Sequence, residues 1–252
     1  MSMLELTPDF IKEFAAYLST EAGLRNGSIW ANCMWLKGVV MKAHYNGLIP
    51  RNPFIQFHIS PNVKEREYLT EDELKAVMTH EFADSKLAYI RDIFIFASFT
   101  VLSFVDIQEL TNDNIVEVNG EKWILSKRHK TKVAFQVKLL DIPLQIVERY
   151  RPMQKDNRIF PDLNYWSICK PLKRMIRECG ITKSISFHCS RHGFATLALS
   201  KGMPIESVSR VLGHTNIVTT QLYAKITTQK LDNDLTMFGD KLSKTFNGIT
   251  MS

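Results

Sequence analysis

The sequence predicts a mainly α-helical protein with one small three-stranded antiparallel sheet and a small, separate helical domain at its N-terminus. Three observations predict this fold class. Apolar residues recur at helical spacing through most of the 252 residues. Strand-like alternation is confined to residues 114–140. A stretch with three prolines and a charged cluster, residues 48–70, interrupts the helical pattern and places a domain boundary near residue 64.

Two helices are predicted in the N-terminal domain, residues 1–63. The first follows Thr7, a good capping residue, and has Pro8 at its first position, where the fixed φ of proline suits a helix. The second covers residues 28–47 and ends at Gly47. Both helices carry apolar residues at helical spacing, so we expect them to pack against each other.

The larger domain, residues 64–252, begins with a helix behind a capping box formed by Thr70 and Glu73. The next segment, around residues 86–100, is apolar nearly all the way round a helix and should therefore be buried. Asn119-Gly120 between two alternating runs predicts a two-residue hairpin turn. A third strand, Val133–Leu139, follows a basic loop, and the chain after Ile142 reads as helices joined by loops.

Composition is consistent with a cytoplasmic protein that binds a polyanion. The net charge of +6 favours an anionic partner, although ordinary surface charge would also account for it. No apolar run is long enough to cross a bilayer, and the N-terminus lacks the features of a signal peptide. Neither a zinc site nor a disulfide framework is expected, because the four cysteines are scattered: Cys33, Cys169, Cys179 and Cys189.

Four large polar side chains stand among apolar neighbours in residues 187–224, "FHCSRHGFATLALSKGMPIESVSRVLGHTNIVTTQLYA". They are His188, Arg191, His214 and Tyr223. Such groups are costly to bury without partners, so together they are suited to holding an anion. Each alone has a structural explanation, such as a helix cap for His188. Order and spacing are more specific: His188-x-x-Arg191, a Leu-Gly-His with its histidine 23 residues later, and Tyr223 nine residues after that.

This pattern resembles the tyrosine recombinase family, the phage-type integrases, over roughly residues 65–225. The resemblance implies a site-specific DNA recombinase that cleaves and rejoins DNA through a covalent 3′-phosphotyrosine, without cofactor or metal, during integration or excision of a mobile element. Tyr223 would be the nucleophile, and Arg191 and His214 would donate hydrogen bonds to the phosphate oxygens. His188 would accept the tyrosine proton or also contact the phosphate.

The resemblance also implies a lysine between the second and third strands that protonates the departing 5′-oxygen. Lys130 lies at the matching position, and Lys127 and Lys132 are neighbours that could be confused with it. The alternative is a solvated basic hairpin that only touches the DNA backbone.

The chain departs from the family where a Thr-Gly-Leu-Arg box is usual. Here Thr100-Val101-Leu102-Ser103 lacks both the glycine and the arginine. The pattern is similar to that of Bacteroides-type mobile-element integrases, with Arg91 as the favoured substitute and Arg128 as the runner-up. If Arg91 is structural, Asp106 or Glu109 is its expected partner.

Asp106 falls where the family usually carries an acidic residue. We expect it to orient arginine or histidine side chains, with a helix cap as the alternative.

Residues 1–63 resemble the later half of the family's core-binding domain. The first helices of that domain are expected to be absent, and so is the family's arm-type DNA-binding domain. Candidate contacts to the backbone of double-stranded DNA are Arg25, Lys37, Lys42, Arg51, Arg128 and Lys132.

At the other end, residues about 228–244 carry Leu231, Leu235, Phe238 and Leu242 on one stripe. The resemblance implies that this helix docks on a neighbouring protomer in a tetrameric synapse; packing on its own domain is the alternative.

Three other functions compete with the recombinase. A recombinase-like protein without chemistry would only bind DNA, and a type IB topoisomerase would share the chemistry without a defined site. A two-metal nuclease needs converging carboxylates. The acidic residues that raise this idea occur where caps and turns account for them: Asp92, Asp106, Glu109 and Asp113.

Overall fold

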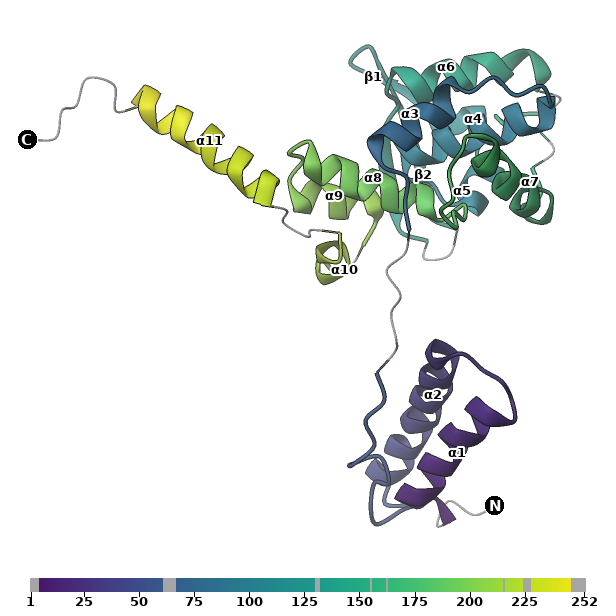
Figure 1. Cartoon of the computed structure of the whole chain (residues 1–252), viewed down its shortest axis with the longest axis vertical. Helices are drawn as coiled ribbons and strands as arrows, with labels where there is room; N and C mark the ends of the chain where they lie inside the picture. Colours follow the sequence, from purple (N-terminus) through teal and green to yellow (C-terminus); the bar gives the residue numbers. More distant parts are fainter. Residues whose placement is uncertain are drawn as a thin grey trace, which may run out of the picture. The chain divides into compact units, whose positions relative to one another are not determined.

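A computed structural model describes residues 5–60, 67–129, 132–154, 156–161, 163–214, 216–223 and 228–245. The chain divides into two compact units, Met1–Glu65 and Arg66–Ser252 (Figure 1). The described elements are mainly helices together with one three-stranded antiparallel sheet, so the predicted fold class is confirmed. Within the described residues, no helix is both long and apolar enough to cross a membrane.

The N-terminal unit is built on two helices, α1 (Pro8–Thr20) and α2 (Asn26–Tyr45), which pack against each other. The Thr7 hydroxyl accepts the Phe10 N–H at 3.2 Å, so the predicted cap forms, with Pro8 as the first helical residue. Two small apolar clusters stabilise the pair, one around Ile11 and Val40 and one around Leu18, Ile29 and Cys33.

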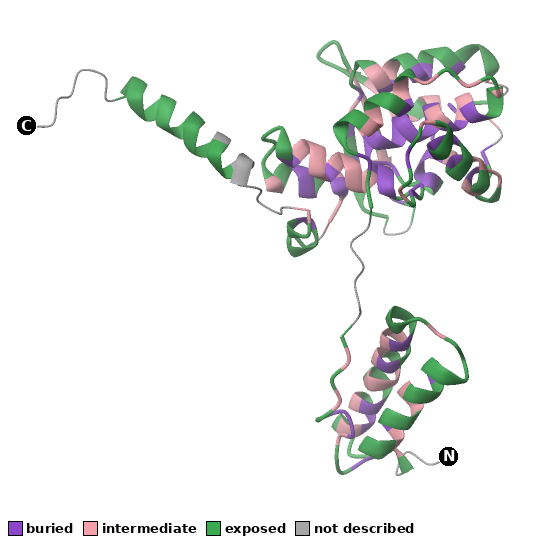
Figure 2. Cartoon of the chain, in the orientation of Figure 1, coloured by how far each residue is buried: buried purple, intermediate pink, exposed green. Residues whose placement is uncertain are grey.

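The centre of the larger unit is α4 (Ser85–Thr100), the helix that was predicted to be buried. It packs against α3 (Glu71–Thr79), α6 (Asp141–Tyr150), α7 (Tyr165–Glu178) and α8 (Cys189–Ser200). Its residues Ile93, Phe94 and Phe96 are almost fully buried, and Figure 2 shows that burial concentrates along this helix. The capping box of Thr70 and Glu73 forms at the start of α3.

The sheet has the order β1-β2-β3, with β1 Ile115–Val118, β2 Glu121–Lys127 and β3 Ala134–Lys138. Asn119 and Gly120 both have positive φ, 53° and 78°, as a tight hairpin turn of the expected kind requires. The register pairs Ile124 with Val137, and this side of the sheet faces the core. The remaining elements are α5 (Phe104–Gln108), η2 (Asn112–Asn114), η3 (Arg151–Met153), α9 (Ile205–Leu212), α10 (Val218–Gln221) and α11 (Thr228–Thr245).

Val101 ends α4 in the left-handed conformation, with φ 61° and ψ 18°. This is the position where the resemblance predicts glycine, and a β-branched residue there is strained by about 1–3 kcal/mol. The side chain of Val101 is fully buried in a cluster with Ala195, Leu199, Val208 and Leu212. Burying a valine contributes roughly 1.5–3 kcal/mol, which offsets the strain and explains why valine is tolerated.

We expect Val101→Gly to be at least as stable as Val101→Ala. Glycine removes one more carbon, worth about 0.8 kcal/mol, but it also relieves a left-handed strain of about 1–2 kcal/mol. Urea unfolding midpoints measure the difference. Val208, buried in the same cluster but inside α9, is the matched control, and there glycine should be less stable than alanine by about 1 kcal/mol. The same ranking at both positions would contradict the argument.

Candidate active site

Two arginines meet where two helices end. Arg191, near the start of α8, and Arg128, directly after β2, both donate through Nη1 to the carbonyl oxygen of Val101, at 3.3 and 3.1 Å. Their Nη2 atoms donate to the last carbonyls of α9, Arg128 to Val211 and Arg191 to Leu212. Carbonyls at a helix C-terminus lack helical partners and carry partial negative charge, so they are suited to receive guanidinium donors.

Asp106 neutralises part of this double positive charge. Its Oδ2 accepts Nη1 of Arg128 at 3.0 Å and the Ser103 hydroxyl at 2.7 Å, while its Oδ1 accepts the backbone N–H of His129 at 2.9 Å. Burial raises the pKa of Asp106, but the hydrogen bonds from His129, Ser103 and Arg128 outweigh it and hold the pKa below its usual value. The carboxylate is therefore ionised and orients Arg128. It also accepts the backbone N–H of Ser103 in the capping box of α5, so Asp106 combines the two roles that were predicted as alternatives.

The arginine pair itself is strained electrostatically. Burial, and then the neighbouring charge of Arg128, lowers the pKa of Arg191 to about 10. Arg128 is only 7% exposed, and its guanidinium carbon lies 4.2 Å from the centre of the Phe135 ring. Among the described residues, Nε of Arg128 is the one buried side-chain nitrogen or oxygen without a hydrogen-bond partner. An anion placed beside the pair would relieve both conditions.

His214 reaches the pair because α9 ends at a glycine. Gly213 has φ 66°, which suits glycine and turns the chain so that His214 follows directly. Nδ1 of His214 lies 2.9 Å from the Thr220 hydroxyl, so the ring is held from one side and Nε2 remains on the other. Burial lowers the pKa of His214, and the charges of Arg191 and Arg128 lower it further, so the ring is neutral near pH 7.

Tyr223 lies next to His214. Its ring is nearly parallel to that of His214, with centroids 6.4 Å apart, and its centroid lies 5.1 Å from that of His192. It is half-buried against the cluster that contains Val101, and its charge acts on the pKa of Arg191. His188 lies at the start of α8 without capping it through its side chain, and its ring lies 4.9 Å from His192.

The structure thus brings together Arg191, His214, His188 and Tyr223, which the sequence had singled out, and adds residues that it had not. His192 and Thr220 were missed. The spacing of four between His188 and His192 could have indicated a shared helix face. For Thr220, the sequence carried no signal that distinguishes it from any other threonine.

The structure places Arg91 elsewhere. Its Nε donates to Asp92 at 2.9 Å and its Nη1 to the carbonyl of His80 at 2.9 Å, and the guanidinium lies over the ring of Phe82. The prediction that Asp106 or Glu109 pairs with Arg91 was wrong. The carboxylate that neutralises Arg91 is that of Asp92, the next residue in the sequence. Nothing in this geometry aims Arg91 at the arginine pair.

The other sequence-predicted residues differ in exposure. Lys130 is outside the described residues. Lys132, Lys42, Arg25 and Arg51 are exposed and Lys37 is half-buried. Arg128 was also expected among the DNA-backbone contacts, but it is buried beside Arg191 and does not lie on the open surface.

The acidic residues that suggested a two-metal nuclease do not converge. Asp92 contacts Arg149 and Tyr150, Asp106 holds Arg128, and Asp113 accepts from Asn157. Within the described part of the chain, no group of three acidic, histidine or cysteine residues is arranged to hold a metal ion.

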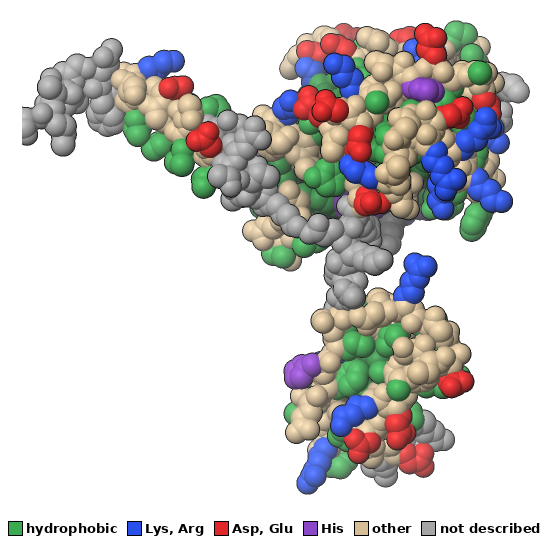
Figure 3. All heavy atoms as spheres, in the orientation of Figure 1, with side chains coloured by type: hydrophobic (Ala, Val, Ile, Leu, Met, Phe, Trp, Pro, Cys, Tyr) green, Lys and Arg blue, Asp and Glu red, His purple; other side chains and the backbone are tan. Residues whose placement is uncertain are grey.

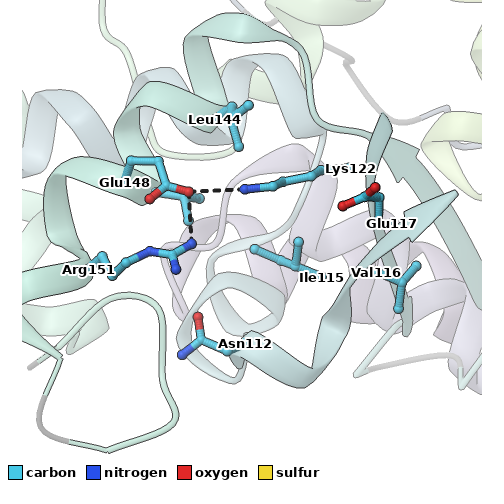
Figure 4. Close-up of a pocket in the computed structure, with 9 residues that line it drawn as sticks. Asn112, Ile115, Val116, Glu117, Lys122, Leu144, Glu148 and Arg151 are labelled. Atoms are coloured by element: carbon cyan, nitrogen blue, oxygen red, sulfur yellow. Dashed lines mark hydrogen bonds and ion pairs between the residues drawn. The ribbon is translucent and has the colours of Figure 1, made fainter. Parts of the chain in front are cut away.

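A hollow of about 300 Å³ between the first hairpin and α6 is a separate feature (Figure 4). Three of its charged side chains pair with one another, since Glu148 accepts from Lys122 at 3.2 Å and from Arg151 at 2.8 Å. None of the predicted site residues lines it.

Comparison with known proteins agrees with this arrangement. Residues 67–230 match the Phage integrase family, and residues 1–59 match the Phage integrase SAM-like domain. Tyrosine recombinase XerA of Pyrococcus horikoshii is 32% identical over 177 residues, which are 65% of this chain and 58% of that protein. Tyrosine recombinase XerC of Lactobacillus leichmannii is 25% identical over 229 residues, which are 85% of this chain and 77% of that protein. The chain therefore spans less than two thirds of the XerA protein.

Solved structures share the fold at low identity. The Tn1549 transposon integrase in complex with circular intermediate DNA has a TM-score of 0.78 at 18% identity, covering 93% of this chain and 86% of that one. XerH bound to palindromic difH substrate has a TM-score of 0.67 at 18% identity, covering 93% and 73%. The narrower resemblance to Bacteroides-type integrases stays a prediction. Because the family match extends over well more than half of its length, the chain belongs to the phage integrase family, the tyrosine recombinases.

Proposed function

We propose that this chain is a site-specific DNA recombinase that cleaves and rejoins double-stranded DNA in the integration or excision of a mobile element. The observation that carries the proposal is the position of Tyr223, which lies beside the pair of buried Arg128 and half-buried Arg191 and near two imidazole rings. A buried positive site next to a phenol is suited to a phosphodiester, which gains charge on its non-bridging oxygens as it is attacked. The Tn1549 integrase and XerH structures were solved with DNA.

In the proposed reaction the Tyr223 oxygen attacks the phosphorus and the bond to the 5′-oxygen breaks. The 3′-phosphate stays on the tyrosine, so the energy of the broken bond is kept and the reverse attack by a 5′-hydroxyl reseals DNA. His214, held through Nδ1 by Thr220, donates from Nε2 to a phosphate oxygen. Lys130 protonates the departing 5′-oxygen, and His188 contacts the phosphate or takes part in removing the tyrosine proton.

We assign the second guanidinium of the site to Arg128 in place of Arg91. Arg128 shares the Val101 carbonyl with Arg191, and its Nε is buried without a partner. A β-carbon at position 213 would lie 3.5 Å from this Nε, so glycine there leaves the space beside it open. The arginine missing at Ser103 is thus supplied from the end of β2, with Asp106 as its anchor.

We propose further that the N-terminal unit is the core-binding domain that grips DNA. Trp35 is 80% exposed and Val39 51% exposed on α2, and helical spacing puts them on one face with the exposed Lys42. An exposed aromatic and aliphatic surface beside a cation fits a DNA groove better than open water. Since DNA is the substrate, we place the protein in the cytoplasm.

On a nicked DNA site that traps cleavage, the wild-type chain is expected to become covalently attached to the 3′-phosphate, and Tyr223→Phe is not. The phenylalanine keeps the ring contacts but lacks the nucleophilic oxygen. A denaturing gel with labelled DNA measures the covalent complex, and peptide mapping locates the linked residue. A chain that binds the site without any covalent product would be a DNA-binding protein only, and relaxation of supercoiled DNA of arbitrary sequence would indicate a topoisomerase.

The same assay separates the two arginines. Arg128→Lys keeps the charge beside Asp106 but loses the rigid fork and Nε, so the cleavage rate should fall roughly 10²–10³-fold. Arg91→Lys, the matched control, should change it less than about threefold. DNA affinity, which we assign largely to the N-terminal unit, should stay within about threefold in both. The assignment fails if Arg91→Lys is the slow variant.

For α11 we propose docking on a neighbouring protomer. Its stripe is open, since Leu231, Leu235, Phe238 and Leu242 are 49%, 59%, 57% and 39% exposed, and Figure 3 shows apolar side chains gathered along one side of this helix. An apolar stripe of this length on one helix favours a protein partner over water.

Replacing Leu235 and Phe238 by Ser should leave binding of one protomer to a half-site unchanged and lower the yield of multi-protomer complexes in a gel-mobility assay. Lys241→Ser with Lys244→Ser is the control on the same helix, because both are exposed and lie off the stripe. Undiminished assembly by the Leu235/Phe238 variant would rule out the docking role.

A further inference from the structure

His192 stands between two residues of the proposed reaction. It follows Arg191 on α8, and because it lies four positions after His188 the two imidazoles share one face of the helix. Ring centroids of His192 and His188 are 4.9 Å apart at an interplanar angle of 83°, and those of His192 and Tyr223 are 5.1 Å apart at 54°. Such distances are those of directly contacting rings. A line of three rings therefore runs from the tyrosine through His192 to His188.

The phenol of Tyr223 has to lose its proton as its oxygen bonds to phosphorus. An unperturbed phenol titrates near pH ~10, so at neutral pH an acceptor is needed. The guanidinium groups of Arg191 and Arg128 are already protonated, so they cannot accept the phenol proton. His214 is poorly placed for the task, since its Nδ1 is engaged by Thr220 and its ring centroid lies further from the tyrosine, at 6.4 Å. His192 is the closer imidazole.

A structural role explains His192 less well. The core face of α8 is formed by Ala195 and Leu199, which are buried in the cluster around Val101. His192 is only half-buried and is turned to the rings of the site. A residue needed only for packing at such a position would serve as well without ionisable nitrogens.

We propose that His192 is the acceptor of the Tyr223 proton and passes it towards His188, an inference that rests on the proposed recombinase function. In the cleavage step the phenolic oxygen bonds to phosphorus and its proton moves to an imidazole nitrogen of His192. The 5′-oxygen leaves with the bonding electron pair and takes a proton from the general acid, for which Lys130 is proposed. In resealing, the 5′-hydroxyl bonds to phosphorus and gives its proton back to the general acid, while the phosphotyrosine bond breaks and the phenolic oxygen regains its proton from the imidazole.

The experiment compares single-turnover cleavage of two trapping substrates, one with a normal 5′-oxygen and one with sulfur at that bridging position. Sulfur leaves as a thiolate, whose conjugate acid titrates near ~8.5, so it needs no general acid. His192→Phe keeps the ring contact without a basic nitrogen and should slow cleavage of both substrates on the order of 10²-fold. Lys130→Ala should be slow only with oxygen. His80→Phe, at a histidine that contacts Phe82 away from the site, should cleave normally.

A second variant separates proton transfer from packing. His192→Ala should regain at least tenfold in rate when free imidazole is added, because the half-buried position is open to solvent on one side, and His192→Phe should not. Three results would overturn the proposal: normal cleavage by His192→Phe, recovery of that variant on the sulfur substrate, or no response of His192→Ala to imidazole. Covalent complex formation by the wild-type chain tests the recombinase function separately, so the two can fail independently.

Discussion

Everything in the site depends on two like-charged guanidinium groups held around one carbonyl oxygen. Arg128 and Arg191 both donate to Val101 at the end of α4, and each also donates to one of the last two carbonyls of α9. Two helix C-termini thus supply the partial negative charge that lets two cations approach each other away from water. The compensation is incomplete, as the lowered pKa of Arg191 shows. In the proposed reaction a phosphate would complete it, so the fold would hold in advance the charge that the transition state needs.

This arrangement supplies the second guanidinium that we propose for a chain without an arginine in its box. Ser103 caps the short helix α5, and its hydroxyl donates to Asp106, which in turn holds Arg128. The second oxygen of Asp106 takes the backbone N–H of His129, the residue before Lys130. One buried carboxylate therefore contacts the altered box, the arginine that we propose as the replacement for its missing member, and the start of the loop that carries the proposed general acid. Loss of the charge on Asp106 would leave Arg128 buried beside Arg191 without an anion. The lowered pKa of Asp106 keeps its carboxylate charged and so prevents this.

Local patterns in the sequence predicted the local structure well. Thr7, the Thr70–Glu73 box and Asn119-Gly120 each specify their own turn or cap, because the atoms that decide the conformation lie within four residues. Arg191, His214 and Tyr223 could be placed together because their spacing follows a family. Arg91 was misjudged for a physical reason: periodicity shows that a helix is buried, but not which neighbour faces a given side chain. Arg128 reaches the site only through the pairing of β2 with β3 and the approach of α9, which no short pattern encodes.

Thr220 of α10 contacts both His214 and Tyr223 and so connects the positions of these two residues. Thr220 is fully buried, its hydroxyl lies 2.9 Å from Nδ1 of His214, and its carbonyl accepts the backbone N–H of Tyr223 at 3.0 Å. The proposed nucleophile and one proposed phosphate donor are therefore positioned by the same residue. A shift of α10 that moves the tyrosine also changes what holds the imidazole, so the two cannot be adjusted separately.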